Sequence, residues 1–231
     1  LGNHWYRVDL ETNEKIRVTE DENGNPYSDG TYDIKQLFGA SADGRYALIS
    51  VPKTSPYDPN IRYLYRKDLS TGEIVRVDTY SDGTPYYSLW ADPEVNLSLD
   101  GKAAVFRAAE YNSGSHLYHK NLVTGELQQV DNWSSLPIGN QGRSTISADG
   151  NIVGVNLGQE GVYVKNMLTG DVQRVDVTAD GQTSDYGGKG SVIVSPDGNY
   201  VAFVTGFDNL IPGHPSDIPP QQLFVKNLLT G

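Results

Sequence analysis

The chain has 231 residues, and its 37% hydrophobic and 20% charged content excludes both a membrane-embedded protein and a disordered tail. Its 18 Lys and Arg residues are outnumbered by 29 Asp and Glu, a net charge of −11 without any basic cluster, which argues against nucleic acid and anionic membranes as partners. There is no cysteine for disulfides, thiolate-bound metals or thiol catalysis, and no apolar run approaches the roughly 20 residues of a membrane span.

Two short phrases alternate along the chain, and each returns several times. The first reads WYRVDLETNEKIRV in its earliest copy, and its copies begin at Trp5, Leu64, Leu117, Val162 and Leu223. The second is Ser-x-Asp-Gly followed by apolar residues, and its copies begin at Ser41, Ser98, Ser147 and Ser195. The glycines of the second phrase are 57, 49 and 48 residues apart, a period that suits the four-stranded blade of a β-propeller.

Each phrase predicts a β-hairpin. In Ser-x-Asp-Gly, the polar side chains can bond to nearby backbone while the glycine takes the left-handed conformation of a tight turn. The Thr-Gly pairs of the longer phrase predict a second hairpin turn, with the glycines at Gly72, Gly125 and Gly170. The first copy has Asn13 at this position, and Asn tolerates positive φ better than other residues with a side chain.

The segments around these turns predict strands that are apolar on both faces. Tyr65 and Leu69 lie four residues apart and share one face of their strand, whereas Leu64 points to the other, and every copy repeats this arrangement. A strand that is apolar on both faces is covered on both sides, as in blades packed face to face. No helical pattern of 10–15 residues separates the strands, which excludes an α/β fold.

A complete unit therefore has four antiparallel strands. We expect them at Ser191 to Val194, at Tyr200 to Thr205, at the Leu-Tyr-x-Lys segment, and at the segment exemplified by Glu73 to Val77. The first and third turns are short and share one edge of the blade. The second connection and the link to the next unit are expected to be long and to emerge at the other edge, which we call the long-loop face.

The expected fold is an all-β propeller in a single domain, residues 1–231, with about four and a half blades. Its repeats span about 1–35 (partial), 36–90, 91–142, 143–190 and 191–231 (incomplete). The first copy of the longer phrase has no Ser-x-Asp-Gly before it, and the last copy has no strand after it. Two interpretations stay open: a five-bladed ring that closes imperfectly, or part of a larger ring in which the remaining blades of a longer chain are its partners.

The repeats resemble the TolB-like β-propeller family of bacterial periplasmic and secreted proteins. The resemblance rests on Ser195 to Phe203 and on Leu223 to Leu228 with the following Thr-Gly, together with the loop motif Asp208 to Gly213. It implies an extracellular or periplasmic location and a binding or scaffolding role, and it supplies no general catalytic residue. TolB-like propellers also occur as gating domains of serine oligopeptidases and as polysaccharide lyases, so both remain alternatives.

The sequence contains no clear catalytic or metal-binding pattern. There is no Gly-x-Ser-x-Gly elbow. His116 and His119 are three residues apart on a strand and so point to opposite faces, and we interpret His119 as a strand-surface residue. No cofactor is expected. Ca²⁺ is the one ion considered, because Asp21-x-Asn23-x-Asn25 begins like a calcium loop, but Pro26 stands where glycine is required.

Three aspartates, Asp78, Asp131 and Asp176, each follow the last valine of a fourth strand. They either cap the turn that leaves the strand or ring a central pore where they could hold cations.

Aromatic residues of the long-loop face give the strongest functional signal. Exposed Tyr and Trp beside acidic groups suit stacking on sugars or anchoring of a protein partner, although the same residues could fill gaps between blades. The candidate binding residues are Tyr86, Tyr87, Trp90, Trp133, Asp185 and Tyr186. The sequence thus predicts a non-catalytic module that binds a protein or glycan partner through this face.

Overall fold

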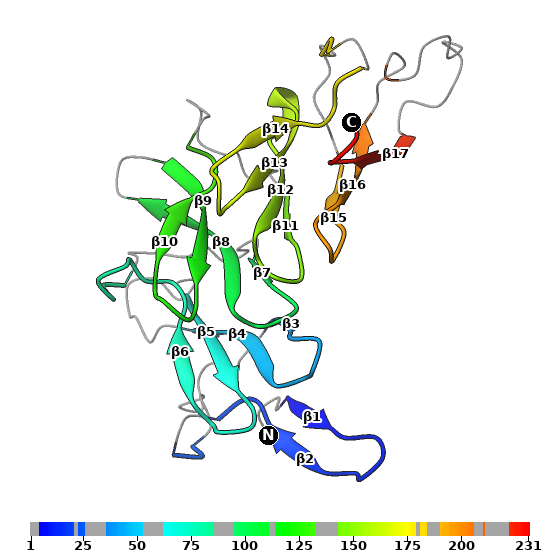
Figure 1. Cartoon of the computed structure of the whole chain (residues 1–231). Helices are drawn as coiled ribbons and strands as arrows, with labels where there is room; N and C mark the ends of the chain where they lie inside the picture. Colours follow the sequence, from blue (N-terminus) through cyan, green and yellow to red (C-terminus); the bar gives the residue numbers. More distant parts are fainter. Residues whose placement is uncertain are drawn as a thin grey trace.

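The computed structural model describes residues 5–20, 23–25, 36–52, 62–85, 95–110, 114–132, 143–178, 181–183, 190–205, 210 and 222–231. The described strands form five antiparallel sheets that follow one another along the chain (Figure 1). The first sheet has two strands, the next three have four each, and the last has three. We number these five sheets blades 1 to 5 in chain order, and we call the five blades together the array.

The strand bounds follow the repeat closely. Blades 1 and 2 contain β1 (Tyr6–Val8), β2 (Lys15–Arg17), β3 (Gln36–Ala40), β4 (Tyr46–Pro52), β5 (Arg62–Asp68) and β6 (Ile74–Arg76). Blade 3 contains β7 (Val95–Leu97), β8 (Ala103–Glu110), β9 (Gly114–Asn121) and β10 (Leu127–Gln129). Blade 4 contains β11 (Arg143–Ile146), β12 (Ile152–Asn156), the 3-10 turn η1 (Gly158–Glu160), β13 (Val162–Asn166) and β14 (Val172–Arg174). Blade 5 contains β15 (Val192–Val194), β16 (Tyr200–Thr205) and β17 (Gln222–Asn227).

The Ser-x-Asp-Gly turn forms as the sequence predicts. In blade 3 the Ser98 hydroxyl donates to Asp100 at 2.6 Å, and the Gly101 amide donates to the Ser98 carbonyl at 2.9 Å. The glycine has φ 72°, a conformation that a side chain disfavours. In the other hairpin, Asn13 replaces glycine with φ 59°, which confirms the interpretation of that exception.

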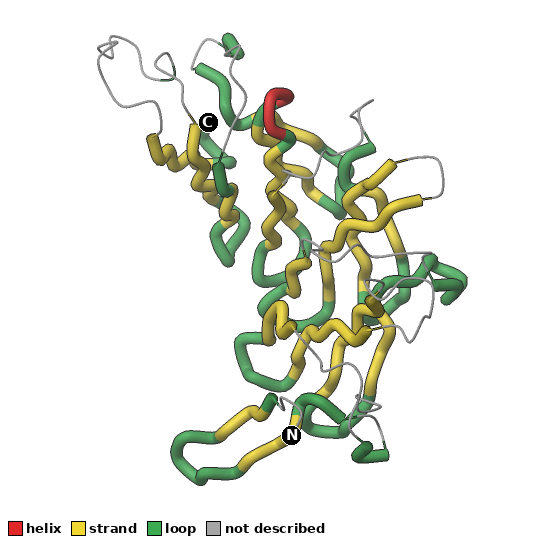
Figure 2. The backbone as a smooth tube through the Cα atoms, turned by 180° about the vertical axis from the view of Figure 1, so that it is seen from behind, coloured by secondary structure: helices red, strands yellow, loops and turns green. Residues whose placement is uncertain are grey.

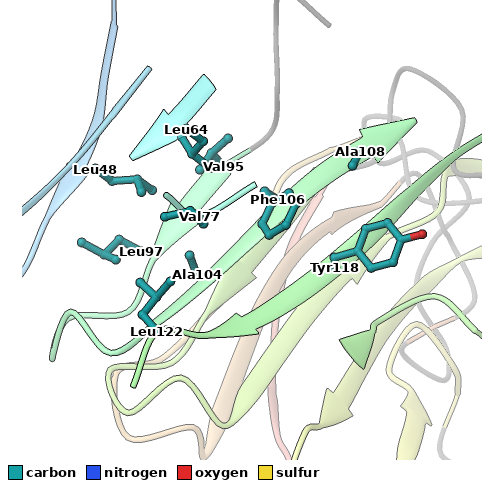
Figure 3. Close-up of a cluster of buried hydrophobic side chains, with 10 residues drawn as sticks. All are labelled: Leu48, Leu64, Val77, Val95, Leu97, Ala104, Phe106, Ala108, Tyr118 and Leu122. Carbon is teal, nitrogen blue, oxygen red and sulfur yellow. The ribbon is translucent and has the colours of Figure 1, made fainter. Parts of the chain in front are cut away.

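Blades stack face to face, and hydrophobic cores lie between them rather than within any single sheet. We call the side of a blade covered by the next blade its forward face, and the side covered by the preceding blade its back face. Leu48, Leu64 and Val77 on the forward face of blade 2 pack against Phe106 and Tyr118 on the back face of blade 3 (Figure 3). Similar clusters join the other neighbouring blades. The strands are therefore covered on both sides, as their apolar faces predict.

The first strand of each complete blade is innermost. β3 contacts β7, β7 contacts β11 and β11 contacts β15, so these strands line the inside of the array. The Asn96 side chain links two of them by donating to the Ser144 carbonyl at 3.0 Å. The blades follow an open arc, with the two chain ends at opposite ends of it (Figures 1 and 2). Of the described helical segments, none is long and apolar enough to cross a membrane.

One expectation about the connections is wrong. The second connection of a blade is not generally long, because only residues 111–113 separate β8 from β9, and only residues 157–161 separate β12 from β13. In blade 4 the tight η1 turn makes this short link possible, with the Gly158 amide donating to Asn156 Oδ1 at 2.8 Å. In blades 3 and 4 the long-loop face is therefore formed mainly by the links between blades.

Candidate functional site

All six candidate binding residues lie outside the described residues: Tyr86, Tyr87, Trp90, Trp133, Asp185 and Tyr186. The structure does describe the base of the loops that carry them. Each of these loops leaves from the end of a fourth strand, β6, β10 or β14, beside the start of a third strand.

A buried aspartate stands at the base of each of these loops. Asp78, Asp131 and Asp176 are 1%, 0% and 0% exposed. Asp78 Oδ1 accepts a hydrogen bond from the Leu64 amide at 3.0 Å, and Asp131 Oδ1 accepts one from the Leu117 amide at 3.3 Å. These two carboxylates thus continue the pairing of the third and fourth strands beyond the last residue of the fourth. Because those strands lie on the outside of the array, the aspartates cap strand ends and do not ring a pore.

Each buried carboxylate has a nearby cationic partner or a histidine. Arg76 Nη2 lies 2.9 Å from Asp78 Oδ2, and Arg174 Nε lies 2.9 Å from Asp176 Oδ1. Burial raises the pKa of the Asp78 carboxyl, and the Arg76 guanidinium opposes that effect. Without such partners, charged carboxylates at these positions would be strongly destabilising.

The residue that precedes Leu64, Leu117 or Val162 in the chain adapts to this partner. In blade 2 the Arg76 guanidinium stacks on the Tyr63 ring, 3.8 Å from its centroid. In blade 4 the corresponding residue is Gly161, where a Cβ atom would lie 2.7 Å from the Arg174 guanidinium. In blade 3 Gln129 replaces the arginine, and the residue before Leu117, His116, supplies Nδ1 at 3.0 Å from Asp131 Oδ2.

The two described histidines point to opposite faces, as expected, but the surface interpretation of His119 is wrong. His119 is 7% exposed, and its Nε2 lies 2.9 Å from the Gly150 carbonyl of the next blade. A carbonyl can only accept, so Nε2 carries the proton. Burial lowers the pKa of this imidazole. Arg7 and Arg66 occupy the same position in blades 1 and 2 and donate to the carbonyls of Gly44 and Gly101 at 3.2 and 3.0 Å.

Buried lysines fix the loop bases from the other side. The Lys120 ammonium of blade 3 donates to the Thr79 and Tyr80 carbonyls of blade 2, each at 2.9 Å. Lys67 and Lys165 make equivalent contacts, donating to the Glu20 carbonyl at 2.8 Å and the Gln129 carbonyl at 2.9 Å. Burial lowers the pKa of the Lys120 and Lys165 ammonium groups. The sequence interpretation missed this role, although the lysine recurs in four copies of the longer phrase.

A further hairpin follows several of the fourth strands, and the sequence interpretation missed it too. Isolated bridges join Thr79 to Pro85 in blade 2 and Val177 to Thr183 in blade 4. The turns contain Gly83 and Gly181 with φ 84° and 81°. An Asp-Gly or Asn-Gly pair at a fixed distance after the end of the fourth strand was the available signal. Blade 3 has Asn132 and Trp133 at that point instead.

In the part of the chain that the structure describes, the charged groups at the loop bases serve as anchors. Within the described ranges, no three His, Asp or Glu side chains come together as a metal site. Asn23 and Asn25 of the calcium-like sequence are described, while Asp21 and Pro26 lie outside the described residues. The charged groups at the loop bases are engaged in strand capping and in contacts between blades. This arrangement can hold loops in place for binding.

These features define a β-propeller of four-stranded blades, and the comparison with solved structures agrees. TolB from Acinetobacter baumannii matches with a TM-score of 0.52 and 17% identity, over 99% of this chain and 47% of that one. The propeller domain of the Trilobed protease from Pyrococcus furiosus is described as having an open velcro topology. It matches with a TM-score of 0.58 and 9% identity, over 97% of this chain and 61% of that one. A prolyl endopeptidase structure matches with a TM-score of 0.60 and 18% identity, over 97% of this chain and 31% of that one.

The chain shares the TolB-like propeller fold with these proteins, and at these identities the likeness concerns the fold. It spans about half the length of the TolB structure. No family model matches the sequence, and no curated protein does.

Proposed function

We propose that the chain is a non-catalytic propeller module that binds a protein or glycan partner through its long-loop face. We place it in the periplasm or outside the cell, in keeping with the TolB-like fold. The aromatic residues Tyr86, Tyr87, Trp90, Trp133 and Tyr186, with Asp185, would supply the contacts. Aromatic side chains offer large contact areas at a low cost in conformational entropy.

The observation that carries this proposal is the anchoring of the loop bases. The loop after Asp78 begins at a buried carboxylate held by Arg76, and Lys120 of the next blade binds its first carbonyls. The loop after Asp131 is held in the same way by His116 and Lys165. Fixed bases reduce the entropy that is lost when loops are ordered on binding.

The test is binding of the purified chain to a glycan array and to candidate proteins in pull-down experiments. We expect the double variant Trp90→Ala with Trp133→Ala to lose most of the binding, because central aromatic contacts commonly contribute 2 kcal/mol or more each, about 30-fold in affinity. Leu168→Ala is the matched control, since Leu168 is 75% exposed in a hairpin turn at the opposite edge of the blade. Binding that survives the double variant unchanged would overturn the aromatic part of the proposal.

A second candidate is the gating propeller of a serine oligopeptidase, which the structural likeness to a prolyl endopeptidase favours. This function requires a hydrolase domain outside the present chain, because the sequence contains no Gly-x-Ser-x-Gly elbow. The intact mass of the native protein and its labelling by a fluorophosphonate probe decide between the two. A larger, labelled protein supports the gate, and an unlabelled protein supports the binding module.

A further inference from the structure

We propose that the edge of the blades opposite the long-loop face is a docking surface for a partner protein that carries a basic amphipathic segment. Two short hairpin turns of each blade form this edge: the Ser-x-Asp-Gly turn between its first two strands and the Thr-Gly turn between its last two. We call it the short-turn face. The inference does not rest on the proposed function, because it concerns a different surface of the chain.

Aliphatic side chains project into solvent from the short turns of blades 3 and 4. Val123 and Leu168, at the tips of the two Thr-Gly turns, are 69% and 75% exposed. Leu99, in the Ser-x-Asp-Gly turn of blade 3, is 41% exposed. Apolar side chains that gather on one exposed surface commonly mark an interaction site.

The Thr-Gly turn does not need an aliphatic residue at its tip. In blade 4 the Leu168 amide donates to Asn166 Oδ1 at 2.9 Å, and blade 3 repeats this bond. In blade 2 the tip residue is Ser70, and its amide donates to Asp68 Oδ1 in the same way at 2.8 Å. The turn is thus held by the same hydrogen bond with a polar or an apolar tip, so a contact outside the chain accounts better for the exposed valine and leucine.

Backbone hydrogen bonds join the short turns into one surface. The Asp100 amide of blade 3 donates to the Ala148 carbonyl of blade 4 at 3.0 Å, and the Ala148 amide donates to the Pro196 carbonyl of blade 5 at 2.9 Å. Within blade 3 the Leu122 amide donates to the Lys102 carbonyl at 2.7 Å, which ties the Thr-Gly turn to the Ser-x-Asp-Gly turn. The tips are therefore in place before a partner arrives, and little entropy is lost in ordering them.

Carboxylates accompany the aliphatic tips and indicate the charge of the partner. The four short turns of blades 3 and 4 carry Asp100, Glu126, Asp149 and Asp171, and Lys102 is the one basic residue in them. Its ammonium group lies 4.0 Å from Asp100 Oδ2. Complementary charges orient a partner and speed its association. A segment in which Lys or Arg residues alternate with apolar ones matches both the carboxylates and the tips.

The same charges disfavour two other occupants of this surface. Carboxylates repel an anionic membrane, and a second copy of the chain would bring its own net charge of −11 to the contact. A basic protein segment is attracted instead, and its apolar side chains can cover the tips.

The test is fluorescence anisotropy of the whole chain with a labelled amphipathic peptide of leucine and lysine, and with a matched peptide of leucine and glutamate. We expect the lysine peptide to bind at least about 10-fold more tightly than the glutamate peptide, and to bind more weakly as the salt concentration rises. The double variant Val123→Ser with Leu168→Ser keeps every charge and copies the tip of blade 2. It should weaken binding of the lysine peptide by at least about 10-fold, because the apolar tips are no longer buried.

The double variant Ile193→Ser with Val225→Ser is the matched control. Ile193 and Val225 are 60% and 65% exposed, and they lie within β15 and β17, away from the turns. This variant should bind the lysine peptide like the wild type, and circular dichroism verifies that all variants are folded. Equal binding of the two peptides, or of the wild type and the tip variant, would overturn the proposal. Self-association or binding to phosphatidylcholine vesicles that is lost in the tip variant would also overturn it, because the tips would then serve a second copy or a membrane.

The two proposed surfaces can be told apart with any protein partner that carries a basic amphipathic segment. Binding that is lost in the tip variant and kept in Trp90→Ala with Trp133→Ala supports docking on the short-turn face. Binding that is kept in the tip variant and lost in the tryptophan variant would overturn it and leave the long-loop face as the binding surface.

Discussion

At the scale of single residues, His119 links the stability of the array to pH. Burial holds the pKa of its imidazole below the ordinary value, so the unfolded chain takes up the proton more readily than the folded chain. Its contribution to stability is therefore complete above the unfolded pKa of about 6.5 and is lost as the pH falls below it. We expect His119→Gln to weaken the decline in unfolding free energy between about pH 7 and pH 5, measured by urea denaturation.

A second substitution separates this titration from the hydrogen bond. His119→Val copies Val164, the residue at the same position in blade 4. It removes the titration as well as the bond to the Gly150 carbonyl, so it should cost about 1–2 kcal/mol even at pH 8. The glutamine variant can keep the hydrogen bond and should lose less unfolding free energy at that pH. If the unfolding free energies of the wild type and of both variants changed in parallel with pH, the result would contradict this account.

At the scale of elements, the glycine of the Ser-x-Asp-Gly hairpin has two roles: it permits the turn, and it allows close contact with the preceding blade. Substitution can distinguish them. Gly150 and Gly125 both have φ 79°, so alanine at either position meets the same backbone strain, about 1–2 kcal/mol. A Cβ at Gly150 would lie 2.5 Å from Ala103 Cβ of the preceding blade, whereas a Cβ at Gly125 meets nothing within 4 Å. We expect Gly150→Ala to destabilise the protein by about 1–3 kcal/mol more than Gly125→Ala, because only Gly150→Ala overpacks a contact between blades.

Chemical denaturation of the two alanine variants measures this difference. Equal losses of unfolding free energy would show that the turn tolerates a side chain at the blade contact. The result would then assign the glycine to turn geometry alone.

The same elements show what the sequence could and could not reveal. The turns and strands were predictable because Ser98, Asp100 and Gly101 make contacts within a few residues of one another. The polar contacts between blades were not, because Lys120 meets residues about 40 positions earlier and His119 meets one 31 positions later. The candidate aromatic residues were found by composition, and their mutual arrangement depends on loops whose contacts the repeat pattern does not encode.

At the scale of the whole molecule, stability should vary along the array, because a stack of repeats is held mainly by contacts between neighbours. Blade 3 is covered on both faces, and side chains of Lys120 and Lys165 join it to blades 2 and 4. Among the described residues, blade 5 is covered on its back face alone, and blade 4 meets it with Val164 where the earlier blades place an arginine or histidine. We therefore expect β15, β16 and β17 to open at a lower free energy than β8 and β9.

Native-state hydrogen exchange measures this gradient. Amides of β16 should exchange by local opening, while those of β8 should require nearly global unfolding. Uniform protection across the array would instead mean that the blades unfold as one cooperative unit and that the contacts between them are stronger than their side chains suggest.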